Sequence, residues 1–567
     1  MIGTYAAALA VSVASLAIGQ AAIALCGRRR WSWLSPAVGL ALLCAVCWGT
    51  VRLPGEGAVS AIVLLLLSAA AVAYLWSRLE GGGEALRIGA PVAAIALLAA
   101  SLPFAVEGHF GILGTSFNPD MSQHLLATDR LAAGQGSQLL HQGYPLGPHA
   151  IVVALNKGLG IGLVQGFGGL TVAIAVLASL TALAAFADKP ALLRIPAALV
   201  VGLVYMVASY FAQGAFKETM QALFVLAFAL SLRERQLIPA ALIAAGSVYT
   251  YSFPGLTWLL GTAVIWGAVE WLGGTRVLPA GRLRAVLWAV ALFVLLVAPE
   301  IPRMIDFHSF ETFDPHGPGL GNLFGQISPF EALGIWPSGD FRLAPGDGAV
   351  PALGYYLGAA FGTILLVYGA VLCWRRRETA LLSGLAAAAL AYAAARLGGT
   401  PYTAAKAVEI AAPLATVVIV LPLLRRPVAW LYLLAAAGCS LLALANAPVG
   451  PTSYSPALAE LRSALGEGPT LVLAPRQLLE DEHGTPYISW ELRGGRVCIE
   501  ASDEAGGRRP AGVRFVVAEA ESRRPPFAGF RLDRVAPPYI LWRRTGPVHG
   551  KSRCPLIAVR QARQGTP

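Results

Sequence analysis

The chain has 567 residues, of which 56% are apolar and only 13% are charged, and its mean hydropathy is +0.64. A soluble globular domain carries roughly twice that charged fraction, so the composition predicts a polytopic membrane protein and excludes a disordered chain. Seven cysteines in this length exclude a disulfide-stapled mini-protein, and the net charge of +11 has to be judged from where the basic residues lie.

Apolar runs of about 17 to 25 residues, each long enough to cross a hydrocarbon core of ~30 Å, follow one another along the chain as far as residue 447. They predict fourteen transmembrane helices, near 1–25, 33–51, 58–77, 88–106, 167–187, 195–211, 215–232, 237–252, 254–272, 285–301, 351–374, 379–397, 404–424 and 428–447. The short pair on either side of Pro254 has an alternative, one broken or re-entrant element buried in protein. The first run lacks a basic flank and a clear cleavage site, which predicts a retained helix rather than a signal peptide.

Basic residues flank these spans unevenly, and Lys and Arg are retained on the cytoplasmic side of a membrane. Seventeen of them fall in alternate loops: Arg28, Arg29, Arg30, Arg78, Arg87, Lys189, Arg194, Arg233, Arg235, Arg276, Arg282, Arg284, Arg375, Arg376, Arg377, Arg425 and Arg426. Only eight lie in the opposite loops and span ends before residue 450. The bias places the N-terminus, the long loops 107–166 and 302–350, and everything after residue 450 outside the cytoplasm.

The composition changes abruptly after residue 450, where the chain becomes soluble. A short helix is predicted at 458–465, and strands are predicted at 470–474, 496–500, 513–518 and 539–543. These elements indicate a small α/β domain on the outer face. Its two cysteines, Cys498 and Cys554, would lie in an oxidising compartment. The sequence is compatible with a disulfide between them and with two free thiols. No nucleic-acid-binding motif is found, and no nucleic-acid partner is expected.

The first long outer loop is dense in polar residues, with the segments EGH at 107–109, FNPDMSQH at 117–124 and YPLGPH at 144–149. Asn118 followed by Pro119 predicts a helix start with Asn118 as the N-cap, which puts Asp120 in the first turn and His124 one turn further on the same face. This helix is expected to run to about residue 133. A second helix, starting at Pro148 and ending near residue 157, is too short to span and is expected to lie in the membrane interface.

An ionised carboxylate at a helix N-terminus beside the membrane has the properties of a general base acting on a lipid-linked substrate, because the positive end of the helix favours the anion. A plain structural role is the alternative, in which Asp120 stabilises the first turn and His124 makes ordinary hydrogen bonds. The two side chains can also bind a divalent cation weakly. Asp129 next to Arg130 is most simply a local ion pair.

These features resemble the GT-C superfamily of membrane glycosyltransferases, which take a sugar from a polyprenyl-phosphate donor on the outer face. The resemblance rests on Asp120 in a long outer loop, two short loop helices, the YPLGPH segment, the many spans and the C-terminal soluble domain, and it covers roughly residues 88–567. It implies three additional N-terminal helices within 1–87, a GT-C-like transmembrane module at 88–449 and an extracytoplasmic α/β domain at 450–567. Two departures stand out: the acidic loop follows the fourth span instead of the first, and no Asp-Asp or Asp-x-Asp motif is present, so no metal requirement carries over.

The resemblance implies an inverting transfer in which Asp120 takes the proton of an acceptor hydroxyl while the lipid phosphate leaves. The acceptor is an envelope glycan, a lipid or a protein, and the membrane lipid is the remaining partner. Supporting positions in the same loop are His124, Asp129, Tyr144 and His149. No cofactor is implied, and a divalent cation stays open.

The leaving phosphate needs cations, and charged residues near apolar segments are usually paired or functional. Candidates at the outer span ends are Lys406, Arg396, Lys217 and Arg303. Lys406 and Arg396 come first because both lie beside one outer turn. Structural lysines whose ammonium groups reach the interface are the alternative, with Lys406 paired to Glu409 three residues on.

The second long outer loop, 302–350, is rich in Gly and Pro and has the character of a lid. His308, Asp314 and His316 match no strong metal-site spacing, so solvated loop residues are expected there. Trp336 and Tyr355 suit stacking on a sugar and the aromatic belt of the interface equally well. Two other classes of function stay open: a transporter or flippase for a lipid-linked glycan, and a non-catalytic scaffold for envelope assembly. Against transport, the spans show no internal repeat and few internal charges.

Overall fold

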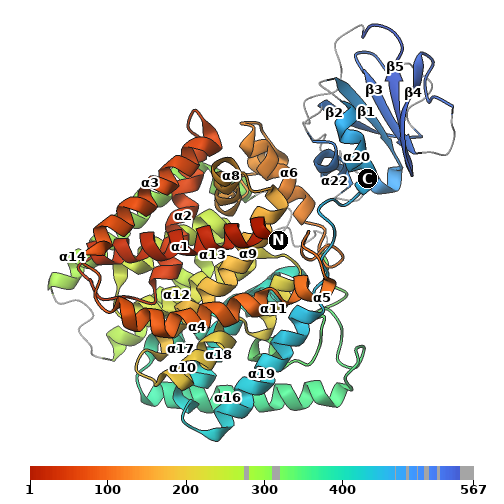
Figure 1. Ribbon diagram of the computed structural model, residues 1–567. Coiled ribbons are helices and arrows are strands. Elements are labelled where there is room, and N and C mark those ends of the chain that lie inside the picture. Colours follow the sequence, from red (N-terminus) through yellow and green to blue (C-terminus); the bar gives the residue numbers. More distant parts are fainter. Residues whose placement is uncertain are drawn as a thin grey trace. The chain divides into compact units, whose positions relative to one another are not determined.

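A computed structural model of the chain describes residues 1–273, 280–308, 319–465, 468–480, 484–493, 496–503, 510–519 and 524–548. The chain divides into two compact units. The helical unit comprises 1–118 and 142–449, and the α/β unit comprises 119–141 and 450–567 (Figure 1). The segment 119–141, which holds Asp120, therefore groups with the residues after 450.

Ten helices of the described residues are long and apolar enough to cross a membrane. They are α1 (Ile2–Leu25), α3 (Glu56–Trp76), α4 (Gly82–Ala100), α9 (Leu163–Ala182), α13 (Leu237–Leu272), α14 (Ala280–Val297), α16 (Ala352–Arg375), α17 (Thr379–Gly398), α18 (Pro401–Leu423) and α19 (Pro427–Ala445). The pair α10 (Ala191–Gly202) and α11 (Tyr205–Ala212), bent by 48°, adds an eleventh if it is one span. The chain is thus a multi-pass membrane protein, and the predicted number of fourteen spans is not confirmed.

Between fourteen and the upper count of eleven, the difference consists of two short or charged helices and of two predicted runs that are joined in one element. The helix α2 (Ser35–Val51) has only 17 residues, and α12 (Phe216–Arg233) carries charges at both ends. The two runs around Pro254 form one element, α13, which breaks at Ser252 with φ 57° and ψ −155°. An ion pair of 2.9 Å joins Arg235, just before α13, to Glu270 near its end. A straight helix over this stretch would separate Arg235 from Glu270 by roughly 50 Å. The second half of α13 therefore runs antiparallel to the first half.

Several of the basic loops meet at one end of the helical unit, which we call the basic end; it comprises residues 28–30, 78–87, 185–194, 233–236 and 375–379. Hydrocarbon excludes charge, so loops on one side of a membrane are expected to share one end of a helix bundle. The contacts that join them are Arg28 with Glu234 (2.5 Å), Arg30 with Glu84 (3.3 Å), Arg233 with Glu378 (2.6 Å) and the Arg233 guanidinium donating to the carbonyl of Ala185 (3.2 Å). The structure thus puts these loops on the same side, as the charge pattern predicts.

The α/β unit contains a five-stranded sheet in the order β2 (Arg496–Ala501), β1 (Pro469–Ala474), β3 (Phe515–Glu519), β5 (Tyr539–Arg544) and β4 (Phe530–Ala536). β2, β1 and β3 are parallel, and β5 and β4 continue the sheet antiparallel. The predicted helix is α20 (Pro456–Leu465), and four of the strands were predicted. β4 was missed because three of the seven residues in its sequence FRLDRVA are charged, as suits an edge strand.

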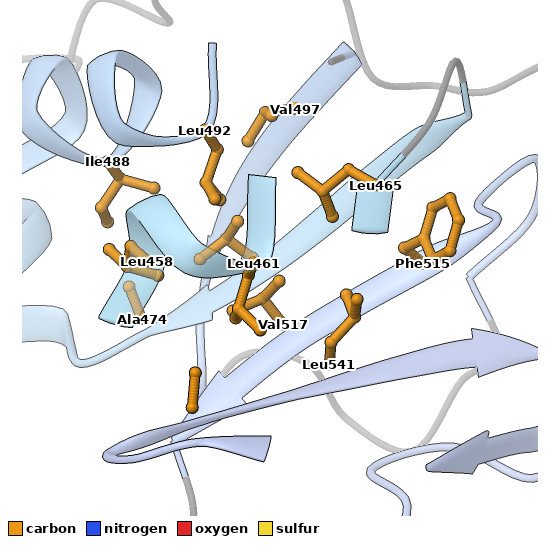
Figure 2. Packing of buried hydrophobic residues seen from close by; sticks show 12 residues of the cluster. Leu458, Leu461, Leu465, Ala474, Ile488, Leu492, Val497, Phe515, Val517 and Leu541 are labelled. Carbon is orange, nitrogen blue, oxygen red and sulfur yellow. The ribbon is translucent and has the colours of Figure 1, made fainter. Parts of the chain in front are cut away.

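Alternate residues of these strands fill two separate cores, as the period of a strand requires. Val517 and Leu541 face α20, where Leu458, Leu461 and Leu465 are buried against them (Figure 2). On the opposite face, the neighbouring strand residues Val516 and Ile540 pack with Phe527, Phe530 and Trp542. Cys498 of β2 is disulfide-bonded, and Cys554 lies outside the described residues.

Close packing of α1 on α2 depends on glycine at the crossing. A Cβ atom on Gly39 of α2 would overlap the backbone of Ser15 on α1, and one on Gly19 would overlap Ser35. Small residues allow this approach, on which helix association inside a membrane relies. Gly49 lies further along α2, and a Cβ there meets open space.

We therefore expect Gly39→Ala to destabilise the protein by about 1–3 kcal/mol, although Ala is the better helix former. The matched change Gly49→Ala should leave stability unchanged or raise it by up to about 1 kcal/mol. Thermal unfolding of the two purified variants in the same detergent, followed by tryptophan fluorescence, measures the difference. Equal melting temperatures for both variants would contradict the close α1–α2 crossing.

Candidate functional site

Asp120 occupies the N-cap position of α6 (Met121–Ala132), so the helix begins later than the sequence predicts. Asn118 is not the N-cap, because its backbone N–H donates to the carbonyl of Gly114 (2.9 Å) in a turn that closes before the helix starts. Pro119 is likewise outside the helix. Within the described helix, the Asp120 side chain makes no capping hydrogen bond.

α6 packs on α22 (Gly484–Glu491) of the same unit, and His124 is buried. Asp129 lies within electrostatic range of Arg462 and Arg493, two cations of the residues after 450. Its neighbour Arg130 donates to the side chain of Gln135. Asp129 thus places a negative charge of α6 near two arginines of the rest of the α/β unit.

Asp120 also has a titratable neighbour in the α/β unit, Tyr454. Burial raises the pKa of the Tyr454 hydroxyl, and the negative charges of Asp120 and Glu491 raise it further. Glu491 is itself buried, which raises its pKa, while the backbone N–H groups of Tyr454 (2.5 Å) and Ser455 (3.4 Å) donate to it. The hydroxyl beside Asp120 therefore stays protonated at neutral pH.

In the helical unit, Tyr144 joins two of the predicted phosphate-binding cations. The ammonium of Lys217, at the start of α12, lies 4.0 Å from the centre of the Tyr144 ring. The guanidinium of Arg303, in α15 (Ile301–Phe307), donates to the Tyr144 carbonyl oxygen (2.5 Å). Three segments far apart in the sequence thus bring an aromatic face and two cations together.

Glu300 holds the Arg303 side of this arrangement, and sequence reasoning missed it. Its carboxylate lies 3.3 Å from the Arg303 guanidinium and 3.5 Å from that of Arg52, and it accepts a hydrogen bond from the indole of Trp48 (2.6 Å). Arg303 also lies over the Trp48 ring, 4.6 Å from its centre. The sequence feature that could have identified Glu300 is its position as an acidic residue at the end of a long apolar run.

Lys406 of α18 pairs with Glu218 of α12 at 3.1 Å, and its ammonium lies 4.1 Å from the centre of the Tyr402 ring. The predicted pair of Lys406 with Glu409 is wrong, because the packing of α12 on α18 offers Lys406 another carboxylate. Both carboxylate oxygens of Glu409 are buried and lack a hydrogen-bond partner among the described residues. Since Glu218 adjoins Lys217, Lys406 lies next to the Tyr144 arrangement.

We call Tyr144, Lys217, Glu218, Arg303 and Lys406 the cation cluster. It lies at the far end of the bundle from the basic end, because α12 runs from Lys217 to Arg233, a distance of roughly 24 Å. Arg396, a first choice from the sequence, donates to Gln326 in an exposed position, and no described contact joins it to the cluster.

His149 is fully buried in α8 (Gly147–Leu159), against the rings of Tyr144, Phe167 and Phe216. This helix, which the sequence predicts to lie in the membrane interface, is buried over residues 147–155 and packs against α2, α3 and α9. Burial lowers the pKa of His149 to about 3. The imidazole is therefore neutral, and its ring packs edge to face against the ring of Tyr144.

The second outer loop contributes less than its sequence suggests. Trp336 and Tyr355 are buried and pack edge to face on each other with ring centres 5.1 Å apart, so neither offers a face for a sugar. Asp314 and His316 lie outside the described residues, and His308 stacks on Phe253. Among the residues that the structure describes, no three His, Cys, Asp or Glu side chains are placed to hold a metal ion.

No protein-family model and no curated protein sequence matches this chain. Among solved structures, the crystal structure of ArnT from Cupriavidus metallidurans bound to undecaprenyl phosphate is similar to it, with 15% sequence identity and a TM-score of 0.43. The similarity covers 82% of this chain and 99% of that one. It concerns the course of the chain and assigns no residue a role.

The buried His149 predicts a pH dependence of stability. The imidazole of the unfolded chain takes up a proton below pH 6.5, whereas the folded one resists protonation to about pH 3. Stability is therefore complete above pH 6.5 and is lost as the pH falls, by about 2 kcal/mol between pH 7 and pH 5. Melting temperatures at both pH values should fall more for the wild type than for His149→Phe. Equal slopes for the two proteins would show that His149 is not buried as a neutral group.

Proposed function

We propose that this chain is a membrane glycosyltransferase, which moves a sugar from a polyprenyl-phosphate donor to an acceptor hydroxyl. The observation that carries the proposal is the cation cluster, where Lys217, Arg303 and Lys406 meet at one end of the helical unit. Cations held among apolar helix ends are costly, and the two carboxylates that pair with them, Glu218 and Glu300, leave the three cations with a surplus of positive charge. The phosphate of a lipid at the membrane surface has the charge and the location that such a cluster requires.

Each cation of the cluster has a described contact that fixes its position. Lys217 rests on the face of Tyr144, which stabilises the cation. Arg303 donates to the Tyr144 carbonyl and also pairs with Glu300 at 3.3 Å. Lys406 pairs with Glu218, which compensates the charge of its ammonium. Lys217 and Arg303 are therefore the proposed phosphate ligands.

The proposed reaction is a single inverting displacement. Asp120 accepts the proton of the acceptor hydroxyl, and the freed oxygen attacks the anomeric carbon of the sugar. The bond between that carbon and the phosphate oxygen breaks as the new glycosidic bond forms. The polyprenyl phosphate leaves with its negative charge, which Lys217 and Arg303 stabilise. The start of α6 favours the ionised form of Asp120 that the step needs.

The charge pattern of the loops supports placing this reaction on the outer face of the cytoplasmic membrane. In that orientation the basic end faces the cytoplasm, and the N-terminus and the α/β unit lie outside. The acceptor is then a hydroxyl of an envelope glycan, lipid or protein. A hexosyl and a pentosyl donor both fit the proposal.

Asp120→Asn should abolish sugar transfer, with a loss of about 10²- to 10⁴-fold for a missing general base. The test uses purified protein in lipid with radiolabelled polyprenyl-phosphate sugars of several kinds. Asp503→Asn is the matched control, because Asp503 also lies in the α/β unit and pairs with the exposed Arg476. Full transfer by Asp120→Asn would eliminate it as the base.

Lys217→Gln should raise KM for the donor about tenfold, the effect of losing roughly 1.4 kcal/mol of one charged contact, and should change KM for the acceptor little. Arg396→Gln is the control, since Arg396 is exposed and contacts Gln326. Initial rates over a range of donor concentrations give both constants. A larger effect of Arg396→Gln would move the phosphate site to the turn at 396–406.

Glu409 favours a second candidate, transport of a lipid-linked glycan or an ion. A buried carboxylate in a spanning helix, without a hydrogen-bond partner among the described residues, suits an ion or proton pathway. Glu409→Gln should then block movement of a fluorescent lipid-linked sugar across proteoliposomes. If Glu409→Gln retains transfer and no movement is seen in the wild type, the transport candidate is excluded.

A further inference from the structure

A second polar site lies at the basic end, where α12 turns into α13 and α16 turns into α17. These turns enclose a pocket of about 340 Å³, lined by four arginines and three glutamates together with Trp266 and Thr379. The volume is ample for a phosphate group with its first substituents. The cation cluster lies at the other end of α12, so this pocket is independent of the proposed transferase site.

The three carboxylates of the pocket are already neutralised by arginines. Glu378 pairs with Arg233 through two parallel contacts of 2.6 and 2.7 Å. Glu270 pairs with Arg235 at 2.9 Å and also accepts a hydrogen bond from Thr379 (2.8 Å). The third, Glu234, pairs with Arg28 at 2.5 Å. The acidic side chains therefore hold the walls together and leave little negative charge in the pocket.

Arg376 and Arg377 supply the surplus positive charge. Among the described residues, neither guanidinium has an ion pair or a hydrogen bond. Arg377 follows the end of α16 with φ +58°, and Arg235 follows the end of α12 with φ +57°. Glycine is the favoured residue at such left-handed helix ends, so an arginine at both positions is unusual. Two guanidiniums with ten N–H donors thus line a concave, positively charged space.

Two exposed tryptophans lie close in sequence to residues that line the pocket. Trp271 of α13 is 73% exposed and Trp374 of α16 is 65% exposed, and each is next to or near a residue that lines the pocket. Tryptophan at this level of a membrane helix sits among lipid headgroups. Basic pockets between transmembrane helices bind the phosphates of lipid headgroups.

We propose that this pocket binds a phosphate group, with Arg376 and Arg377 as its ligands. The guanidiniums match phosphate oxygens in geometry and charge, and the exposed tryptophans suit the acyl chains of an anionic phospholipid. A soluble phosphate ester shares the same recognised group, and the two sources differ in whether acyl chains contribute to binding. A bound phosphate group would link the α12–α13 turn to the α16–α17 turn, in addition to the ion pairs that already join them.

The test is native mass spectrometry of the purified full-length protein in detergent, titrated separately with phosphatidylglycerol, phosphatidylcholine and glycerol 1-phosphate. Phosphatidylglycerol should bind more tightly than phosphatidylcholine, and Arg376→Gln/Arg377→Gln should weaken it by on the order of tenfold. The matched control is Arg29→Gln/Arg425→Gln, which removes the same charge from exposed residues outside the pocket. The control should retain wild-type binding.

Equal binding by the wild type and the Arg376/Arg377 variant would overturn the proposal, as would an equal loss in the control pair. Tighter binding of glycerol 1-phosphate than of phosphatidylglycerol, with the same dependence on Arg376 and Arg377, would support the pocket and assign it a soluble phosphate ester. Neither result depends on sugar transfer, so the pocket and the proposed transferase are tested separately.

Discussion

An ionised side chain is costly in the hydrocarbon of a membrane, and this cost determines where the charged residues of the helical unit lie. The helix α12 shows it directly: Lys217 and Glu218 open the helix, Arg233 closes it, and residues 219–232 between them carry no charge. Charged residues from distant parts of the chain gather in the same two layers. The basic end and the cation cluster are the result, and the apolar helices between them keep the layers roughly 24 Å apart.

The two layers use their charges in different ways. At the basic end, arginines pair with glutamates and fasten helix ends that are far apart in the sequence, as Arg233 does with Glu378. In the cation cluster, the cations rest largely on aromatic faces: Lys217 on Tyr144, Lys406 on Tyr402 and Arg303 on Trp48. Such contacts stabilise a cation without neutralising it, and the two carboxylates that pair there, Glu218 and Glu300, leave a surplus of positive charge for an anion. This difference is the physical reason to look for a phosphate-handling site at the cluster.

The sequence predicted a series of apolar helices and the gathering of several basic loops at one end of them, because hydropathy and the position of arginines are local properties. It failed where the deciding partner is distant in the chain. Lys406 has Glu409 three residues away, yet it pairs with Glu218 from another helix, and Glu300 and Trp48 became visible as partners of Arg303 only in the structure. The burial of α8 and the grouping of 119–141 with the residues after 450 likewise depend on tertiary packing. The role of Asp120 remains a prediction.

The most direct test of the account is to locate the lipid phosphate itself. A polyprenyl phosphate with a photoreactive group beside the phosphate should be crosslinked to the purified protein in lipid, and the labelled peptides identified by mass spectrometry. The account predicts labelling in the segments around Tyr144, Lys217 and Arg303, and its loss in competition with unmodified polyprenyl phosphate. Competable labelling confined to other segments would contradict the assignment of the cation cluster to the donor.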